Sequence, residues 1–533
     1  MPKIAENINH IRELHRTGHL EQAKQGYLRL LRKNPKHIEA LHSVGVISAQ
    51  QKNFSQAVTY LQQAIHFQPA EPTIQLHLAN VLKIQGAYSE AAKLLEKTVE
   101  SHPNYVPAFN NLGTIYYAKG DITKAIELYK KAISKEPNYA DAYYNLGLAL
   151  TKNNQPAEAI GMLQRLLEHV PDHFAARFHL GCAYMQQELF DKAIETFSMI
   201  ETSHPHHFET QTNLATCYLK QCSWNNAKIH YAKALELNPE DTQTLFNLGY
   251  LHMQQNNLDM AIQYYQRTVN INPNLFAAQN NLAVAFLSKP HIALALQHFR
   301  EALRIQPDNK SIPYTIQALE QNQPLISAPP DYVQSLFDSY ADHYESHLLN
   351  ALDYRIPMLF KKTLLPFISS TASLDILDLG CGTGLCGALF KPYAKSLTGV
   401  DLSPNMLAVA AEKKLFDKLI TQELTEFLMQ KHQQFDLILA GDVVVYLGDL
   451  TNLFNLVKQA LRTRGIFIFN AEICQESSFK MNQSGRFSHS KDYIDSQITK
   501  NNFTIHSYQN IITRQQNNQP VYGHLYVASL SKS

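Results

Sequence analysis

Nine prolines recur at intervals of 34 residues through the first three hundred positions, and this spacing constrains the fold more than any other feature. They are Pro35, Pro69, Pro103, Pro137, Pro171, Pro205, Pro239, Pro273 and Pro307. Glycine or alanine stands ten residues after each of the first eight, and alanine stands 22 residues after them without interruption, from Ala57 to Ala295. A leucine or an aromatic residue follows four positions after each of these alanines. A repeat in this register predicts one supersecondary unit copied along the chain.

Each column of the repeat has a physical reason. Small residues let two helices approach closely, the larger apolar residues fill the space between units, and the proline ends one helix before the next begins. A 34-residue period with these columns is that of the tetratricopeptide repeat. We predict an α-solenoid of nine units over residues 1–309, followed by a capping helix and linker over 310–330, where three prolines mark a boundary.

One polar column of the repeat carries amides. Eight residues after the prolines stand Asn111, Asn145, Asn213, Asn247 and Asn281. A side-chain amide is both donor and acceptor, so a row of them can pair with the backbone of an extended peptide. The row resembles the asparagine ladder in the repeat superhelix of O-GlcNAc transferases, which implies a protein or peptide bound in the concave surface. The alternative is that these amides bond to neighbouring helices or water, because the row is interrupted at positions 43, 77 and 179.

Composition excludes several classes of protein. Lysine and arginine number 47 against 46 aspartate and glutamate, a formal net charge of +1, so no bulk field attracts nucleic acid or an anionic membrane. The six cysteines have neither the density nor the spacing of a disulfide scaffold or a zinc site. No apolar run reaches the ~18 residues of a membrane span, and no signal-like segment opens the chain. We therefore expect a cytoplasmic protein with no metal, no membrane span and no nucleic-acid partner.

A glycine-rich turn organises the last third of the chain. The apolar run 374–379 predicts a buried strand, three glycines follow at Gly380, Gly382 and Gly384, and residues 385–393 have helical character. A helix that starts at such a turn offers free N–H groups and the positive end of its dipole to a ligand. A second strand, 396–400, ends at Asp401, about 20 residues after the first glycine, where an acid meets a ribose diol in nucleotide-binding folds.

The turn has two interpretations. Residues 382–387 form a GxGxxG pattern, which alone is weak support for a nicotinamide or flavin site. The wider pattern, an acid at Asp378 followed by Gly-x-Gly-x-Gly and then Gly-Val-Asp-Leu-Ser at 399–403, resembles class I S-adenosylmethionine-dependent methyltransferases. Segments 332–348, 352–357, 441–449 and 484–490 are similar to a bacterial group of these enzymes that carries tetratricopeptide repeats. The resemblance covers 331–533.

The resemblance implies an α/β Rossmann-like domain after the solenoid, with N-terminal lid helices over 331–370 and a core over 371–533. Strands are expected at 419–422, 435–440, 465–470, 503–508 and 521–529, in addition to the two beside the glycines. Strands that alternate with helices indicate a parallel sheet with the ligand at its carboxyl edge. In the family the seventh strand inserts antiparallel, which suits the hairpin-like end of this chain.

The resemblance also implies a role for each site residue. The three glycines cradle the methionyl part of the cofactor, and Cys381 is also assigned to the cofactor site. Asp378 orders the loop or meets the ammonium group through water, and Asp401 takes the ribose hydroxyls. Leu402 and Met406 sandwich the adenine, with Glu423 and Leu424 at its edge. Ala440 and Asp442 lie beside the amino acid group and the acceptor. Tyr340, Tyr344 and Arg355 close the site, although packing aromatics and a surface arginine explain these residues equally well.

Methyl transfer from a sulfonium needs positioning and exclusion of water, and a base only where the acceptor must lose a proton. The candidate bases are Asp442, Tyr446 and His489. We therefore expect an S-adenosylmethionine-dependent methyltransferase whose repeats recruit a protein partner or substrate. The alternatives are a small-molecule methyltransferase whose repeats only dock it in a complex, and a scaffold with an inactive methyltransferase domain.

Overall fold

The computed structural model describes residues 8–320, 325–338, 341, 344–346, 348, 352, 354–368, 372–516 and 519–531. The chain forms two compact units, Met1–Leu251 and His252–Ser533. The boundary between the units falls inside helix α15 (Thr242–Gln254), within the repeats. The division expected from sequence, at 309 and 330, stays a prediction.

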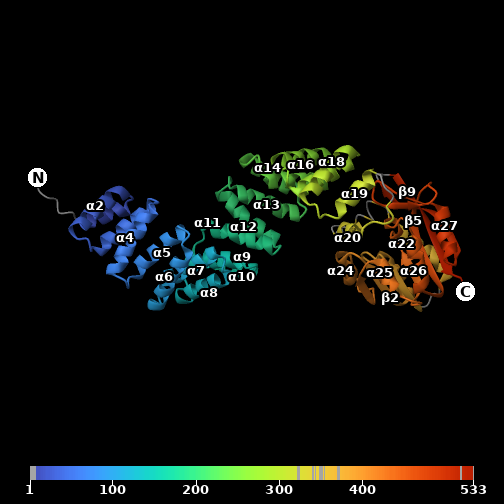
Figure 1. Ribbon diagram of the computed structural model, residues 1–533, viewed down its shortest axis with the longest axis horizontal. Helices are drawn as coiled ribbons and strands as arrows, with labels where there is room; N and C mark the ends of the chain where they lie inside the picture. The colour runs from blue at the N-terminus through green and yellow to red at the C-terminus, as the bar shows by residue number, and fades with distance from the viewer. Residues whose placement is uncertain are drawn as a thin grey trace. The chain divides into compact units, whose positions relative to one another are not determined.

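The first unit consists of helices joined by short turns (Figure 1). Before α15 they are α1 (Ile8–Arg16), α2 (Leu20–Lys33), α3 (Ile38–Gln50), α4 (Phe54–Phe67), α5 (Pro72–Ile84), α6 (Tyr88–Ser101), α7 (Val106–Lys119), α8 (Ile122–Lys135), α9 (Ala140–Lys152), α10 (Pro156–His169), α11 (Phe174–Gln186), α12 (Phe190–Ser203), α13 (Phe208–Lys220) and α14 (Trp224–Leu237). The first helix of each pair after α2 starts three residues after a proline of the 34-residue series, so the predicted tetratricopeptide repeat is confirmed.

The small residues of the repeat lie where the helices of a pair are closest. A Cβ added at Gly113 would lie 2.5 Å from the ring of Tyr129, and one at Gly181 would lie 2.6 Å from the ring of Phe197. The alanine column is fully buried from Ala57 to Ala295. Each large residue therefore occupies the space that a small residue leaves, which is the reason for the two columns seen in the sequence.

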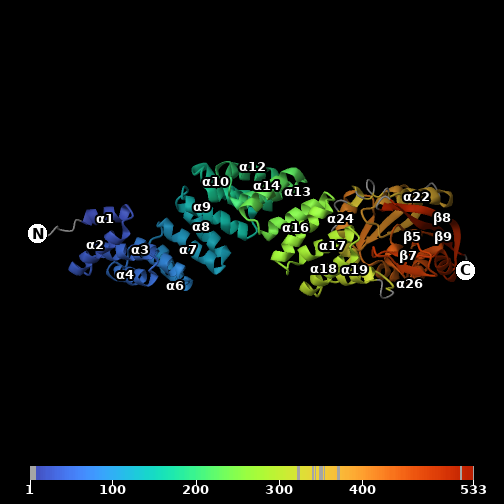
Figure 2. The same ribbon diagram turned by 90° about the horizontal axis from the view of Figure 1, so that it is seen from above.

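The second unit begins with the remaining helical repeats and ends in an α/β domain (Figure 2). Its first helices are α16 (Leu258–Ile271), α17 (Phe276–Ser288), α18 (Ile292–Ile305) and α19 (Ser311–Glu320), of which α19 is the predicted capping helix. Shorter helices follow at α20 (Pro330–Asp338), α21 (Tyr344–Ser346) and α22 (Ile356–Leu364). None of the helices that the structure describes is long and apolar enough to cross a membrane.

A nine-stranded sheet forms the centre of the α/β domain. Its strands are β1 (Leu374–Leu379), β2 (Ala394–Asp401), β3 (Lys418–Thr421), β4 (Phe435–Ala440), β5 (Leu461–Ile473), β6 (Phe479–Met481), β7 (Phe487–His489), β8 (Phe503–Gln516) and β9 (Gln519–Leu530). The order β3-β2-β1-β4-β5 is parallel throughout, and β9 pairs antiparallel with both β5 and β8. All seven predicted strands and the antiparallel insertion of the last one are confirmed.

Helices cover both faces of this sheet. On one face α22 and α23 (Leu385–Phe390) pack through Phe360 and Phe390. On the other face lie α25 (Leu424–Met429), α26 (Thr451–Ala460) and α27 (Lys491–Lys500), packed through Phe427, Phe454 and Ile494. Helix α24 (Pro404–Glu412) follows β2. The two apolar cores hold the carboxyl ends of β1, β2 and β4 at one edge, where a ligand site is expected.

The β6–β7 hairpin is an addition that the sequence did not predict. Beyond the end of β4, β7 pairs in parallel with the last residues of β5, at Glu472 and Ile473. Strand β6 pairs antiparallel with β7 at the margin of the sheet. The hairpin therefore extends the sheet on the side where the strands end.

Candidate functional site

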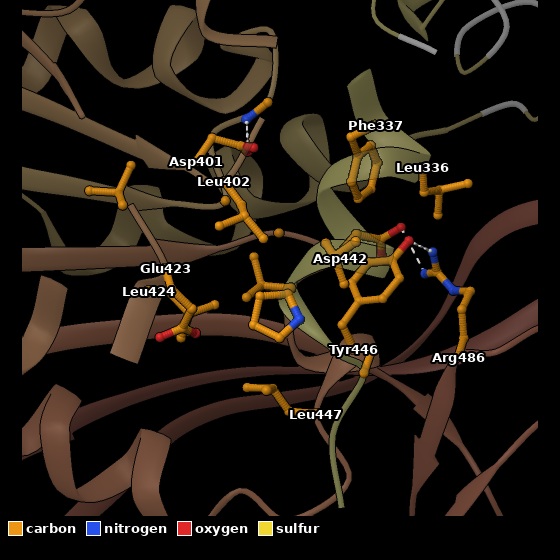
Figure 3. Close-up of a pocket in the computed structure, with 18 of the residues that line it drawn as sticks. Leu336, Phe337, Asp401, Leu402, Glu423, Leu424, Asp442, Tyr446, Leu447 and Arg486 are labelled. Carbon is orange, nitrogen blue, oxygen red and sulfur yellow. Dashed lines mark hydrogen bonds and ion pairs between the residues drawn. The ribbon is translucent and has the colours of Figure 1, made fainter. Parts of the chain in front are cut away.

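A cavity that is partly open to solvent lies at the carboxyl edge of the parallel strands. Counted out into the open solvent, the space between its walls is about 1240 Å³. The strand ends, the β6–β7 hairpin and helix α20 contribute to its wall. Figure 3 shows Asp401, Leu402, Glu423 and Leu424 at one end of the cavity, and Phe337, Asp442, Tyr446 and Arg486 at the other.

The glycine turn lies between β1 and α23, and its backbone requires glycine. The φ angles of Gly380, Gly382 and Gly384 are +64°, +52° and +88°, values that L side chains rarely adopt. A Cβ at Gly380 would lie 2.5 Å from Val443. At Gly382, which lines the cavity, an added Cβ would contact a ring carbon of Tyr344 at 3.7 Å without a clash.

Asp401 connects this turn to the end of β2. Its carboxylate accepts hydrogen bonds from the backbone N–H of Gly382 at 2.8 Å and of Ser403 at 2.9 Å. Burial raises the pKa of Asp401, while the hydrogen bonds from Ser403 and Gly382 oppose the rise. Asp401 lines the cavity and retains acceptor capacity on both oxygens.

Asp378 lies at the carboxyl end of β1 and is only 1% exposed. Burial raises its pKa to about 7, the backbone N–H of Gly387 opposes this, and the nearby charge of Asp401 adds to it. One of its carboxylate oxygens has no hydrogen-bond partner among the described residues. A buried carboxylate oxygen without a partner is costly, and it is a place where a cationic or hydrogen-bonding ligand group would be stabilised.

The wall around Asp401 is mostly apolar. Leu402 and Leu424 line it together with Gln422 and Glu423. The Glu423 carboxylate accepts the backbone N–H groups of Thr425 and Glu426 at 2.8 and 3.0 Å and so caps α25.

Five residues expected at the cofactor lie behind this wall. They are Asp378, Cys381, Gly384, Met406 and Ala440, which are all buried and do not line the cavity. Their roles at the cofactor therefore stay predictions.

The lid expected over residues 331–370 supplies apolar side chains. Phe337 and Leu336 of α20 and Tyr344 of α21 line the cavity. The ring of Phe337 meets those of Tyr344 and Tyr446 edge-on, at centroid distances of 5.9 and 5.7 Å. Tyr340 lies outside the described residues.

Two polar contacts fasten this lid to the start and end of α24. The Ser403 hydroxyl donates to Asp338, and Lys413 pairs with Glu345. Arg355 is exposed at the start of α22 and does not line the cavity.

A network of buried charges forms the opposite end of the cavity. Arg486 donates to Asp442 at 3.0 Å and to Glu472 at 2.7 Å, and Arg514 donates to the same oxygen of Glu472 at 2.7 Å. Asp442 has a φ of +58° and is held by reciprocal bonds with Asn470, whose amide donates to its carboxylate at 2.7 Å. Arg486, Arg514 and Asp442 line the cavity, whereas Glu472 stands behind them.

Two of the three candidate bases lie in the cavity, and one does not. Burial raises the pKa of Asp442, but the charges of Arg486 and Arg514, with the hydrogen bonds from Asn470 and Arg486, lower it below its usual value. Burial raises the pKa of Tyr446, whose hydroxyl accepts from Arg486 at 3.4 Å. His489 is fully buried, its Nε2 lies 3.0 Å from the carbonyl oxygen of Gly448, and it does not line the cavity. Burial lowers the pKa of His489 to about 4.

Sequence reasoning did not find the arginines or the apolar wall. Arg486 stands inside 484–490, a segment singled out only for its resemblance, and Arg514 stands in β8 without a local signal. The helical spacing of Val333, Leu336 and Phe337 was the available sign that one side of α20 is apolar, and these three residues line the cavity.

The asparagine row of the repeats donates within the protein. In the first unit the side-chain amides of Asn111, Asn145, Asn213 and Asn247 donate to Asn80, Asn110, Cys182 and Tyr231 respectively. In the second unit Asn281 donates to the hydroxyl of Tyr265. Each amide therefore uses at least one of its two N–H donors inside the repeats, as the packing alternative expects. Peptide binding by the row stays a prediction.

Comparisons with known families assign both halves of the chain. The family model for a methyltransferase domain matches residues 377–469. Models for the tetratricopeptide repeat match residues 9–72, 48–114, 144–207 and 242–275, and a TPR repeat model matches 113–154. The chain thus carries tetratricopeptide repeats followed by a methyltransferase domain.

Several curated relatives are methyltransferases. A probable S-adenosylmethionine-dependent methyltransferase of Saccharomyces cerevisiae is 26% identical over 168 residues, which cover 30% of this chain and 57% of that protein. A malonyl-[acyl-carrier protein] O-methyltransferase of Acetivibrio thermocellus is 26% identical over 143 residues, 26% of this chain and 48% of that protein. The chain spans about half the length of the curated relatives it matches. Among solved structures, YrrB, a TPR protein with an unusual peptide-binding site, is 24% identical with a TM-score of 0.33 and covers 35% of this chain and 95% of its own.

Proposed function

We propose that this protein transfers methyl groups from S-adenosylmethionine to an acceptor that its repeats help to recruit. The observation that carries the proposal is Asp401, a carboxylate at the end of β2 that lines the cavity while it holds the backbone of Gly382. A carboxylate with spare acceptor capacity at this strand end suits a ribose diol.

The residues present fit the cofactor at three further points. Gly382 lines the cavity, Leu402 and Leu424 offer apolar surfaces for a base, and the unpartnered oxygen of Asp378, which lies behind the wall, suits an ammonium group bridged to it by water. When bound, the cofactor supplies a methyl group on a sulfonium, which is a good leaving group. The chain's part is to hold the two reactants, to orient them and to exclude water from the site. The lid residues Phe337 and Tyr344 exclude water, and Asp442 stays ionised between two arginines.

We call the end of the cavity at Asp401 the cofactor end and the end at Asp442 and Arg486 the acceptor end, where the methyl acceptor would bind. The two ends differ in their chemistry. Asp442 is committed to Arg486 and Asn470, and its lowered pKa makes it a poor proton acceptor. Burial raises the pKa of Tyr446 further above neutrality, so its hydroxyl keeps its proton and cannot act as a base. We therefore assign both residues to positioning rather than to general-base catalysis.

Label transfer tests the proposed function. Full-length protein, S-adenosylmethionine labelled on the methyl group and a cell lysate should yield labelled protein. Label in small molecules alone would favour the small-molecule methyltransferase. No label, together with no binding of S-adenosylhomocysteine in calorimetry, would favour the inactive scaffold and contradict the proposal.

Cofactor binding should depend on pH through Asp378. Because its pKa is about 7, the carboxylate takes up a proton as the pH falls from 8 to 6 and ceases to attract an ammonium group. The affinity for S-adenosylhomocysteine, which keeps that group, should fall as the pH is lowered over this range. The decrease per pH unit should not exceed about tenfold, the limit for one linked proton. The folding stability of the free protein should depend on pH in the opposite direction. Because the pKa of Asp378 is raised by burial, ionising this carboxyl lowers the stability as the pH rises toward 7. Calorimetry at each pH measures the affinity, and Asp378→Asn should bind weakly without the pH dependence. A wild-type affinity that is constant from pH 6 to 8 would remove Asp378 from the site.

The partner of the repeats is proposed to be a polypeptide bound along the asparagine row. Changing all five asparagines, 111, 145, 213, 247 and 281, to alanine should abolish methylation of protein substrates. Each bond to a peptide is worth about 0.5–1.5 kcal/mol and several act together. The helical content should persist because alanine is the better helix former.

The matched control for this variant changes Asn80 and Asn110 to alanine. It removes the internal acceptors of Asn111 and Asn145 but keeps their amides available. If the control loses as much methylation as the fivefold variant, or if the fivefold variant keeps it, the row serves packing and the small-molecule alternative gains weight. Circular dichroism and S-adenosylhomocysteine affinity monitor folding in both.

A further inference from the structure

Helix α19, the last helix before the linker, touches the β6–β7 hairpin of the methyltransferase domain. Tyr314 of α19 is 2% exposed, and its hydroxyl donates to the carbonyl oxygen of Gly485 at 2.7 Å. Its ring packs on that of Tyr332 of α20 at a centroid distance of 4.5 Å. Tyr314, Met481 and Phe487 belong to one apolar cluster. The hairpin is thus seated on two tyrosines that precede the sheet in sequence.

The turn of the hairpin is shaped for this seat. Gly485 has a φ of +76°, and a Cβ added there would lie 2.9 Å from the Tyr332 hydroxyl oxygen and 3.3 Å from the Tyr314 ring. Within the turn, Asn482 N–H donates to the carbonyl oxygen of Arg486 at 2.8 Å, and Gly485 N–H donates to that of Asn482 at 2.9 Å. The turn is therefore compact, and the tyrosines contact it where no side chain fits.

The residue after this glycine reaches the reaction cavity. The Arg486 side chain is 15% exposed, and its guanidinium joins Asp442, Glu472 and Tyr446. Because Gly485 and Arg486 are consecutive, a shift of the turn moves the start of the arginine side chain. A guanidinium that bonds to three partners tolerates little displacement, since its donors are fixed in one plane.

Residues 326–328, just before α20, are hydrogen-bonded to the backbone beside Tyr446, at the same end of the cavity as Arg486. Ala328 N–H donates to the carbonyl oxygen of Tyr446 at 2.8 Å, and Gly448 N–H donates to that of Ile326 at 2.8 Å. Ala328 and Tyr446 both line the cavity. Residues that precede the expected start of the methyltransferase domain at 331 are therefore part of its wall.

We propose that Tyr314 is a positioning residue of the methyltransferase. Through Gly485 it holds the β6–β7 turn so that Arg486 meets Asp442 and Tyr446, and the capping helix of the repeats thereby sets the geometry of the acceptor end. Asp401 and the glycine turn lie at the other end of the cavity and are independent of this contact. The inference goes beyond the proposed function, since it holds for any ligand of the cavity.

The test is Tyr314→Phe in the full-length chain, which deletes the hydroxyl and keeps the ring. Its matched control is Tyr526→Phe, which deletes the fully buried hydroxyl that donates to Asp495 of α27 at 2.8 Å. Hydrogen exchange measures how well the backbone amides of 479–489 are protected. The NMR resonance of the Arg486 Nε–H, assigned by its loss in Arg486→Lys, reports the environment of the guanidinium. Tyr314→Phe should speed exchange in 479–489 by roughly two- to tenfold, the effect of one lost hydrogen bond, and should shift or broaden the Arg486 resonance. Affinity for S-adenosylhomocysteine should stay within about twofold of wild type.

Two results would overturn the proposal. In one, Tyr314→Phe leaves the hairpin exchange and the Arg486 resonance unchanged. In the other, Tyr526→Phe changes them equally, which would indicate general loosening. A second variant, Gly485→Ala, displaces the turn from the tyrosines with both hydroxyls present and should reproduce the Arg486 effect. If the wild-type protein does not bind S-adenosylhomocysteine, the proposed function is contradicted. The hairpin measurements still decide the role of Tyr314 in that case.

Discussion

Replacing Asp401 by alanine should leave the sheet folded and reduce the affinity for S-adenosylmethionine more than any other single change at the cofactor end. A charge-assisted hydrogen bond is worth about 1.5–3 kcal/mol, so each lost bond to a ribose hydroxyl lowers the affinity by between about ten- and 150-fold. A second loss follows from the turn. Without the carboxylate, the N–H groups of Gly382 and Ser403 lose their acceptor, and the loop that should meet the methionyl part is no longer held.

Calorimetric titration measures this effect, and Asp417→Ala is the matched control. Asp417 also accepts a backbone N–H, that of Leu397 at 2.8 Å, and pairs with Lys391 at 2.9 Å. It does not line the cavity. The control should bind the cofactor as wild type does. Wild-type affinity in Asp401→Ala would remove this carboxylate from the site and with it the main support for the proposed function.

Glu472→Ala should destabilise the second unit more than any surface substitution. Glu472 is 5% exposed and accepts from Arg486, Arg514 and, at 3.4 Å, Asn482. Removing it leaves two buried guanidinium groups with Asp442 as the remaining carboxylate of the network. Breaking a buried ion pair on one side costs about 3–5 kcal/mol. For a domain of this size the melting temperature should fall by roughly 6–20 °C.

Glu476→Ala is the control for this variant. Glu476 pairs with Lys480 at 2.9 Å, but the two side chains are 55% and 45% exposed. An exposed pair contributes about 0–1 kcal/mol, so the melting temperature should hardly change. Similar melting temperatures for the two variants would mean that water replaces Glu472 and that the network does not stabilise the fold.

Sequence periodicity predicted those parts of the fold in which burial repeats. The alanine column from Ala57 to Ala295 located the helix pairs because each of its positions is fully buried. The apolar runs before Gly380 and Asp401 located β1 and β2 because both strands lie in the middle of a parallel sheet, where both faces are covered. The same two turns lie at the cavity, where Leu402 and Leu424 line it together with Asp401; binding of the cofactor there stays a prediction.

The acceptor end could not be predicted, because it is assembled from four separate segments. Asp442, Glu472, Arg486 and Arg514 follow or belong to different strands, and no local pattern pairs them. Local sequence also could not separate a catalytic histidine from a buried one. His489 precedes the N-cap of α27 and is enclosed by the domain, so its lowered pKa reflects packing. Likewise, the Glu423 carboxylate caps α25, which only the backbone geometry reveals.

The antiparallel insertion of β9 fixes the order in which the second unit can be completed during synthesis. β9 is the last strand in sequence, yet in space it lies between β5 and β8. Among the described residues, β8 pairs with the rest of the sheet through β9 alone, so it has no partner strand there until β9 has left the ribosome. The helical repeats, whose partners are neighbours in sequence, can fold as they emerge. A nascent chain should therefore carry folded repeats before its methyltransferase sheet can close.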